Sequence, residues 1–278
     1  MNGSIQMHAI QTGHVKVKEA QRRRDGGMWG VLTGTAWSEW LPIYAWAIDH
    51  PEGVIVVDTG ETARTADPGY FPRWHPYYRS AVQMKVVPDD EIGPQLRRRG
   101  IDPERVETVI LTHLHTDHAG GLHHFPNAQI FVPGGDYQQA QGLMGKLRGY
   151  LPHRWPSWFT PTPVTYSDGP YGTFPKSHVV TQAGDVVIVP TPGHTASHQS
   201  VLVRTGDVTY FLAGDTSYTE DLLLERVPDG VSPTPRDTLQ TIDRILDLAA
   251  DEPLVYLPSH DPASEKRLAA TTYLYAVA

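Results

Sequence analysis

Three histidines and one aspartate occupy four of six consecutive positions near the middle of the chain. The segment His113-Leu-His115-Thr-Asp117-His118 follows a mostly apolar run, residues 106–111, and precedes the glycines at 120 and 121. Imidazole and carboxylate groups are ligands for zinc, iron, cobalt and manganese, and a strand that leads into a short loop can direct several of them at one point. We therefore predict that the segment belongs to a metal site and is not a solvated turn.

Three further candidate ligands each follow another apolar run. His194 comes after residues 186–189, Asp215 after residues 208–213, and His260 after residues 254–257. A single histidine or aspartate at the end of a strand is usually a turn or capping residue. Four such strand ends in one chain instead indicate a shared site, because enzymes often present catalytic groups on loops that rigid strands support.

This ordered set of residues resembles the ligand pattern of dinuclear members of the metallo-β-lactamase superfamily. The resemblance extends from about residue 54 to residue 260. It implies an α/β fold, a four-layer αβ/βα sandwich with the metals at one edge between two sheets. It also implies that His113, His115 and His194 bind the first metal, that Asp117, His118 and His260 bind the second, and that Asp215 bridges both.

Finer features of the motifs favour one chemistry within the superfamily. Relatives with redox chemistry usually carry glutamate at the second ligand position, where this chain has His115, so hydrolysis is expected. The chain has no cysteine, which disfavours the true β-lactamases that use a cysteine ligand. Residues 191–200 and 214–218 resemble the N-acyl-homoserine lactonases, which carry a tyrosine three residues after the bridging aspartate, the position of Tyr218.

Opening of a lactone ring is chemically reasonable for such a site. Two divalent cations about 3.5–4 Å apart can share a hydroxide that attacks the ester carbonyl at neutral pH. Tyr218 would donate a hydrogen bond to the developing oxyanion, and Asp117 would return a proton to the leaving alkoxide. The alternative for Tyr218 is a loop aromatic that packs on the core with its hydroxyl satisfied.

Two other functions remain open at this point. The first is a different hydrolase on the same metal core, acting on another lactone, a thioester or a phosphodiester, because a fold does not determine a substrate. The second is an inactive metal-binding or interaction protein, which would have no need of a full ligand set. The expected cofactor is two divalent metal ions, with zinc preferred and iron, cobalt or manganese possible for the same ligands.

The remaining histidines have weaker signals. His198 follows the ligand His194 by four residues, and we expect it to support the site without binding metal. His123 and His124 follow the two glycines and are expected to face solvent. Six others have no partner pattern and are interpreted as ordinary residues: His8, His14, His50, His75, His153 and His178.

Composition predicts one enzyme domain, residues 1–278. The hydrophobic content of 40% is enough for a sizeable core, and the net charge of −8 argues against a nucleic-acid surface. We find no signal-peptide pattern and no apolar run of about 18 residues, so a cytoplasmic location and no membrane contact are expected. The predicted partner is a small-molecule lactone.

Several elements can be predicted around the site. Residues 201–212 predict a hairpin that turns at Gly206-Asp207 and brings His194 and Asp215 together. Residues 235–249 predict a helix with Thr234 as its N-cap, and residues 89–99 predict another, acidic at its start and basic at its end.

Aromatic residues concentrate in three segments with unresolved roles. Residues 70–78 and 150–159 combine aromatics with prolines, which suits either the apolar wall of a pocket for an acyl chain or a satellite core. Four tryptophans lie early in the chain and could form a homodimer contact or cover the core. They are Trp29, Trp37, Trp40 and Trp46.

Overall fold

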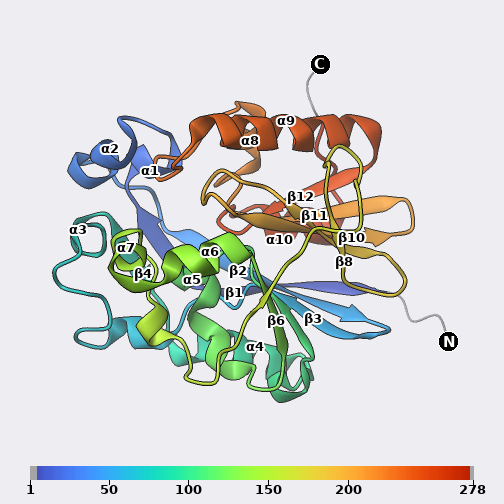
Figure 1. The fold of residues 1–278 in the computed structure, drawn as a ribbon, viewed down its shortest axis with the longest axis horizontal. Helices are drawn as coiled ribbons and strands as arrows, with labels where there is room; N and C mark the ends of the chain where they lie inside the picture. The colour runs from blue at the N-terminus through green and yellow to red at the C-terminus, as the bar shows by residue number, and fades with distance from the viewer. Residues whose placement is uncertain (1–4, 276–278) are drawn as a thin grey trace.

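The computed structural model describes residues 5–275, which form two β-sheets packed face to face with helices on both outer sides (Figure 1). The first sheet has seven strands in the order β4-β1-β2-β3-β5-β6-β7, and the second has five in the order β12-β11-β10-β9-β8. The strands of the first sheet are β1 Gln6–Val17, β2 Leu41–His50, β3 Gly53–Val57, β4 Val82–Lys85, β5 Thr108–Ile110, β6 Gln129–Val132 and β7 Thr162–Pro163. Those of the second are β8 His178–Val179, β9 Val186–Pro190, β10 Gln199–Thr205, β11 Val208–Gly214 and β12 Leu254–Pro258.

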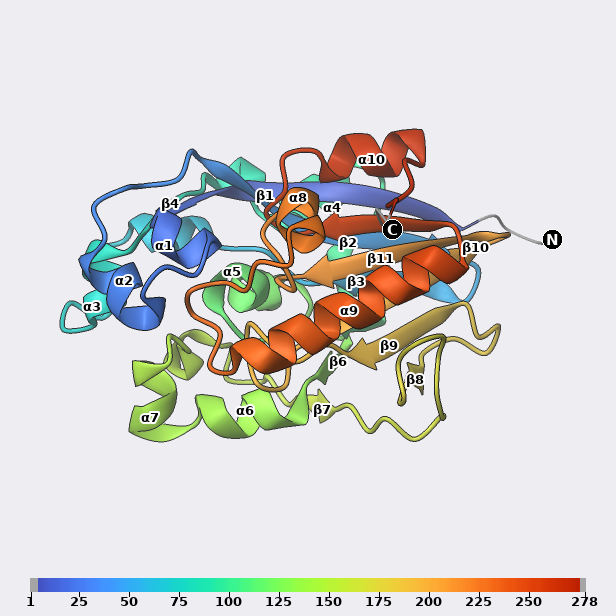
Figure 2. The ribbon, with the colours of Figure 1, turned by 90° about the horizontal axis from the view of Figure 1, so that it is seen from above.

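Most helices are short and lie outside the sheets. The α-helices are α1 Glu19–Arg22, α2 Gly27–Thr33, α3 Pro76–Ser80, α4 Ile92–Arg98, α5 Thr116–Ala119, α6 Gly134–Ala140, α7 Gly142–Leu147, α8 Glu220–Leu224, α9 Pro235–Asp251 and α10 Ser264–Ala270. The 3-10 helices are η1 Ala63–Ala66, η2 Pro88–Asp90, η3 Pro103–Arg105, η4 Gly120–His124 and η5 Pro152–Arg154. In both views α1, α2, α3 and α7 gather at one end of the sandwich (Figures 1 and 2).

Alternating side chains in the strands build three apolar layers. In β11, Tyr210 and Leu212 enter the core between the two sheets, whereas Phe211 and Ala213 enter the core beneath α9. Successive residues of a strand point to opposite faces, so a strand that is covered on both sides must be apolar almost throughout. A further core joins the first sheet to α4. The four-layer αβ/βα sandwich predicted from the sequence is therefore confirmed.

Two of the predicted elements have nearly the expected bounds. β10 and β11 form a hairpin in which Thr205 pairs with Val208, so Gly206 and Asp207 form the turn. Helix α9 begins at Pro235 after the N-cap residue Thr234 and continues two residues beyond the predicted end, Ala249. It lies across the strands of the second sheet (Figure 2).

The helix predicted at residues 89–99 begins later than expected. Pro88–Asp90 form the separate 3-10 helix η2, and α4 starts at Ile92. Glu91 between them has extended backbone angles, φ −59° and ψ 150°. Its carboxylate accepts a hydrogen bond from the backbone N–H of Ala63, so a tertiary contact replaces the first helical turn.

The early tryptophans do not share one surface. Trp46 is fully buried between the sheets, and the Trp37 ring lies 3.8 Å from the Lys18 ammonium. Trp29 and Trp40 are 75% and 42% exposed. Of the two roles left open for these tryptophans, Trp46 has the second and covers the core.

Candidate metal centre

The candidate ligands lie on loops that leave the two sheets at corresponding ends. In the first sheet β3 and β5 are parallel, so the residues after them emerge at the same end. In the second sheet β9 and β11 both pair antiparallel with β10, and β12 is parallel to β11. These strand directions place His194, Asp215 and His260 at one end of the second sheet, within reach of the segment 113–118 after β5.

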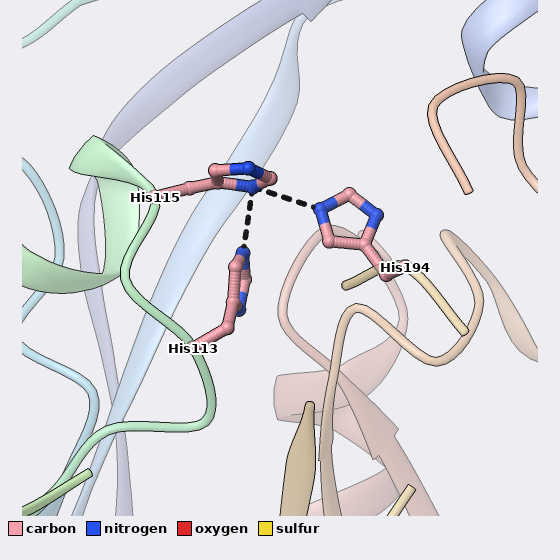
Figure 3. Close-up of side chains that lie close together, drawn as sticks. All are labelled: His113, His115 and His194. Carbon is pink, nitrogen blue, oxygen red and sulfur yellow. Dashed lines mark hydrogen bonds between the residues drawn. The ribbon is translucent and has the colours of Figure 1, made fainter. Parts of the chain in front are cut away.

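Three imidazoles converge through their ring nitrogens (Figure 3). His115 Nδ1 lies 3.0 Å from His113 Nε2 and 3.0 Å from His194 Nε2. One ring nitrogen with at most one proton cannot hydrogen-bond well to both neighbours, whereas a single cation can accept a lone pair from each of three nitrogens. The three side chains therefore have the arrangement of a metal site.

A second group lies beside the first and shares Asp215 with it. His260 Nε2 is 3.5 Å from Asp117 Oδ2, and His118 joins these two in a set of possible ligands. Asp215 Oδ1 lies 3.2 Å from His118 Nε2 and 3.4 Å from His260 Nε2, while Asp215 Oδ2 lies 3.5 Å from Nε2 of His194. The two oxygens of one carboxylate thus face the two groups, the geometry that a bridging ligand requires. All seven predicted ligands lie together.

Acceptors behind three of the imidazoles fix their orientation. In each of these rings Nδ1 lies 2.8 Å from an outer oxygen, so an Nδ1–H donor leaves the Nε2 lone pair directed inward. The pairs are His118 with Asp58 Oδ2, His194 with Asp229 Oδ2, and His260 with the carbonyl oxygen of Pro42.

Two buried polar atoms at the centre lack hydrogen-bond partners. His118 Nε2 and Asp215 Oδ1 lie 3.2 Å apart, yet neither atom forms a hydrogen bond with any group of residues 5–275. A buried polar atom without a partner costs roughly 1–3 kcal/mol. A divalent cation between these atoms would satisfy both, so the side chains fit the metal ions that the resemblance implies.

Charge is distributed unevenly over the centre. Burial lowers the pKa of His113 and His115 well below the ordinary value, and neighbouring imidazoles act in the same direction. Burial also acts to lower the pKa of His118, but the carboxylates of Asp215 and Asp58 outweigh it and raise that pKa. Burial acts to raise the pKa of Asp215, yet the surrounding imidazoles hold it well below its usual range. The Asp215 carboxylate is therefore ionised, as metal binding requires.

Tyr218 lies at the edge of the centre. Its ring is stacked on His260 with centroids 5.5 Å apart, and its hydroxyl accepts a 2.6 Å hydrogen bond from Gln21 Nε2. Burial and the nearby Asp215 carboxylate raise the pKa of Tyr218 well above its ordinary value. The phenol therefore stays protonated and retains a hydrogen to donate.

His198 has contacts that agree with the expected supporting role. Its Nδ1 lies 2.9 Å from Thr191 Oγ1, and its Nε2 accepts a hydrogen bond from the backbone N–H of Asp215. His198 therefore holds the loop that carries Asp215.

Three supporting residues escaped the sequence analysis. Asp58 directly follows the apolar strand β3, so the same strand-end pattern could have identified it. Asp229 and Gln21 lie in segments without a ligand-like motif. Their roles depend on contacts with residues 35 and 197 positions away, which no local pattern reveals.

The prediction that His123 and His124 both face solvent is wrong for His124. Its side chain is 14% exposed and its Nε2 lies 2.8 Å from Glu91 Oε2. His123 is 43% exposed and contacts the same oxygen at 3.1 Å. Glu91 is buried directly before α4, and both imidazoles contact its carboxylate.

Several of the histidines interpreted as ordinary have defined partners, among them His50 and His75. His50 Nε2 lies 3.0 Å from Asp185 Oδ1, which links the end of β2 to the second sheet. His75 is buried, its Nε2 lies 3.3 Å from the carbonyl oxygen of Leu147, and it contributes to the wall of the cavity described next.

A cavity of about 460 Å³ opens directly above the centre. Its lining includes His115, Asp117 and Asp215, and Tyr218 also contributes to its wall. The rest of the wall is largely apolar, with Val15, Val17, Met28, Leu32, Met84 and Leu147 among its residues. Such a volume suits a small molecule that is polar at one end.

The aromatic segments 70–78 and 150–159 contribute both to the wall of this cavity and to a satellite core, the two alternatives left open by the sequence. Tyr77, Tyr78 and Tyr150 line the cavity, as expected of a pocket wall. Trp155 and Phe159 pack on each other and on the core beside the first sheet, as expected of a satellite core. Within residues 5–275, no helix combines the length and the apolar character needed to cross a membrane.

Comparisons with known proteins agree with this geometry. A family model described as Metallo-beta-lactamase superfamily matches residues 38–260. The N-acyl homoserine lactonase AttM of Rhizobium radiobacter is 27% identical over 269 residues, which cover 93% of this chain and 94% of that protein. An N-acyl homoserine lactonase from a Bacillus species is 30% identical over 233 residues, covering 81% and 84%.

Solved structures share the fold over nearly the whole chain. An N-acyl homoserine lactone hydrolase with the product N-hexanoyl-L-homoserine at its catalytic metal centre superposes with a TM-score of 0.76 at 24% identity, covering 96% of both chains. The dizinc quorum-quenching lactonase AidC superposes with a TM-score of 0.64 at 15% identity, covering 94% and 89%. With the family model matched over most of the sequence, the chain belongs to the metallo-β-lactamase superfamily.

Proposed function

We propose that this protein is a metal-dependent hydrolase that opens the lactone ring of N-acyl homoserine lactones. The observation that carries the proposal is a cluster of seven ligand-type side chains, five of which line a cavity whose wall is otherwise largely apolar. A lactone ring beside the ligand cluster and an acyl chain along the apolar wall would match both parts. The relatives named as N-acyl homoserine lactonases support this substrate class.

We assign the ligands as two sets with one shared member. His113, His115 and His194 would hold one divalent cation, Asp117, His118 and His260 the other, and Asp215 both. Zinc is the expected metal because imidazole and carboxylate ligands suit it. Bound divalent cations would supply Lewis acidity and a water-derived nucleophile near neutral pH.

Tyr218 and Asp117 would handle the charge and the proton in the reaction. The Tyr218 hydroxyl accepts from Gln21, so its own hydrogen is free to be donated to the carbonyl oxygen as negative charge develops there. The Asp117 side chain is 14% exposed and lines the cavity, where it would take a proton from the attacking water and pass it to the ring oxygen as the C–O bond breaks.

A hydrolysis panel tests the substrate class. Purified protein with measured metal content should hydrolyse short- and long-chain N-acyl homoserine lactones, and a chelator should abolish turnover. An unrelated lactone, a thioester, a phosphodiester and a β-lactam serve as competing substrates. Two bound metals with no turnover of any homoserine lactone, but turnover of another member of the panel, would replace the proposed substrate.

A pair of matched variants tests the role of Tyr218. Tyr218→Phe removes the proposed donor and should lower kcat for lactones by roughly 100-fold, as loss of an oxyanion donor does elsewhere. Tyr77→Phe is the control, because Tyr77 also lines the cavity and also accepts a hydrogen bond from Gln21. Equal, small effects of both substitutions would show that Tyr218 only packs on the core.

A further inference from the structure

Glu91, His123 and His124 form a second cluster of metal-ligand types, separate from the centre. Glu91 immediately precedes α4, and the two histidines end η4. Glu91 Oε2 lies 2.8 Å from His124 Nε2 and 3.1 Å from His123 Nε2. One ligand atom from each residue lies within 4.8 Å of the others. None of the three belongs to the seven residues described above.

Glu91 is oriented by contacts with its other oxygen. Its Oε1 accepts hydrogen bonds from Thr62 Oγ1 at 3.1 Å and from the backbone N–H of Ala63 at 2.9 Å. The carboxylate is 11% exposed and is therefore fixed by its surroundings. These bonds leave Oε2 to face the two imidazoles.

The two imidazoles are also held in place. A methyl group at Gly93, in the first turn of α4, would overlap the His124 ring, so the ring lies directly on the helix backbone. His123 Nδ1 lies 3.3 Å from the carbonyl oxygen of Gly120. An Nδ1–H that donates to this carbonyl leaves Nε2 of His123 with a lone pair.

With this tautomer of His123, the close approach of its Nε2 to the Glu91 carboxylate requires a positive charge between the two atoms. A lone pair on His123 Nε2 and a carboxylate oxygen 3.1 Å away repel each other unless a proton or a cation lies between them. Ligand atoms around a tetrahedral zinc with bonds near 2.0–2.1 Å lie roughly 3.3 Å apart. The two spacings to Glu91 Oε2, 2.8 and 3.1 Å, are somewhat shorter than this, and all three ligand atoms lie within 4.8 Å of one another. Two imidazoles and one carboxylate are a ligand set that zinc accepts.

We propose that Glu91, His123 and His124 bind a third divalent transition-metal ion, best matched by zinc, at a site on the outer side of the first sheet. Because His123 is partly exposed, the remaining coordination positions are open to water. The ion would join three segments: the start of η1 through Thr62 and Ala63, the start of α4, and the end of η4. Its expected effect is to stabilise these segments against each other.

Zinc titration of the loaded protein tests this site. Protein already saturated at the centre should bind one further equivalent of zinc, measured by isothermal titration and by metal analysis after gel filtration. The double substitution His123→Gln and His124→Gln should remove that equivalent and leave the two central metals and lactone turnover unchanged. A total of two equivalents in the unsubstituted protein would overturn the proposal, and it would identify a proton as the charge between His123 and Glu91.

A second variant guards against loss of folding in the first. Gly93→Ala keeps all three ligands but forces the His124 ring away, so the affinity for the third equivalent should fall roughly 10-fold or more. Added zinc should raise the Tm of the unsubstituted protein beyond the value reached at central saturation, raise that of Gly93→Ala less, and leave that of the double variant unchanged. Retention of the third equivalent in both variants would place that ion elsewhere and overturn the assignment.

Discussion

The carboxylates behind the imidazoles decide which ring nitrogen faces the metal centre. Asp229 is the clearest case. Its Oδ2 accepts from His194 Nδ1 at 2.8 Å, and its Oδ1 accepts from the backbone N–H groups of Val231 and Ser232. The loop thus fixes the carboxylate, and the carboxylate fixes the ring.

Asp229→Asn should weaken metal binding and leave the fold intact. The asparagine oxygen can keep the bonds from Val231 and Ser232, which turns its NH₂ group toward His194 Nδ1–H and disfavours the required tautomer. Metal affinity should fall roughly 10- to 100-fold in chelator competition. Asp221→Asn, at an exposed position of α8, is the control and should change nothing. Equal affinities for the two variants would show that Asp229 does not orient His194.

Glu61 is a buried carboxyl that should make stability depend on pH. It accepts hydrogen bonds from Thr116 Oγ1, from Tyr70 Oη and from the N–H of Thr62. Burial is the largest influence and raises the pKa of Glu61 from 4.5 to about 8 in spite of these bonds. The folded protein therefore binds this proton more tightly than the unfolded chain does.

The sign of the effect follows from linkage. The stability contributed by the proton on Glu61 is fully present below about pH 4.5 and is lost as pH rises toward about 8. Glu61→Gln should make the fall of Tm across this interval less steep. The corresponding change in the free energy of unfolding is a few kcal/mol at most. Thermal unfolding of chelator-treated protein from pH 5.5 to 8.5 measures it without charge from bound cations. Parallel Tm profiles for variant and parent would contradict the raised pKa.

The β10–β11 hairpin shows how an element carries a ligand to the centre. Gly206 in its turn and Gly214 at its end both have left-handed backbone angles, with φ of 60° and 55°. A Cβ at Gly206 would meet no atom within 4 Å, whereas a Cβ at Gly214 would press on Thr112 and His198 at 2.7–2.8 Å. The two glycines differ only in their surroundings, which makes them a matched pair.

Alanine at these two positions should have unequal effects. Gly206→Ala adds only the backbone cost of the left-handed conformation, about 1–2 kcal/mol. Gly214→Ala adds the same cost and also displaces Thr112 and His198, next to Asp215, so stability and metal content should both fall further. Denaturant unfolding and metal analysis measure the two quantities. Similar losses in both variants would show that the close packing at Gly214 can relax freely.

The elements differ in how well their sequences predict them. Helix α9 has a continuous apolar stripe and a clear start at Thr234-Pro235, so its prediction was nearly complete. Helix α4 was predicted about three residues too early, because Glu91 is engaged by Thr62 and Ala63, almost 30 residues away. Local sequence signals therefore predict that a helix exists here, whereas contacts with distant residues determine where α4 begins.

At the scale of the whole molecule, local sequence patterns predict the ligands, whereas contacts between distant residues determine which residues support them. The seven predicted ligands each follow an apolar strand, and strand directions alone bring them to one edge. Asp229 and Gln21 act across the fold on residues far away in sequence. The aromatic segments could not be assigned in advance, because their residues serve both roles: Tyr150 lines the cavity and is also part of the core beside the first sheet, whereas Trp155 packs against that core.

The metal centre also joins the two halves of the sandwich, so removal of metal should destabilise the whole molecule. His113, His115, Asp117 and His118 follow a strand of the first sheet, whereas His194, Asp215 and His260 follow strands of the second. A cation present at about 1,000 times its Kd stabilises the folded state by about 4 kcal/mol, which corresponds to a Tm shift of roughly 10 °C for a chain of this size. Chelation should therefore lower Tm by that order in calorimetry. Asp215→Asn should weaken the proposed binding of both metals, and the variant should show a lower Tm and little response to chelator. An unchanged Tm after measured metal loss from the parent would mean that the two sheets hold together without bound metal.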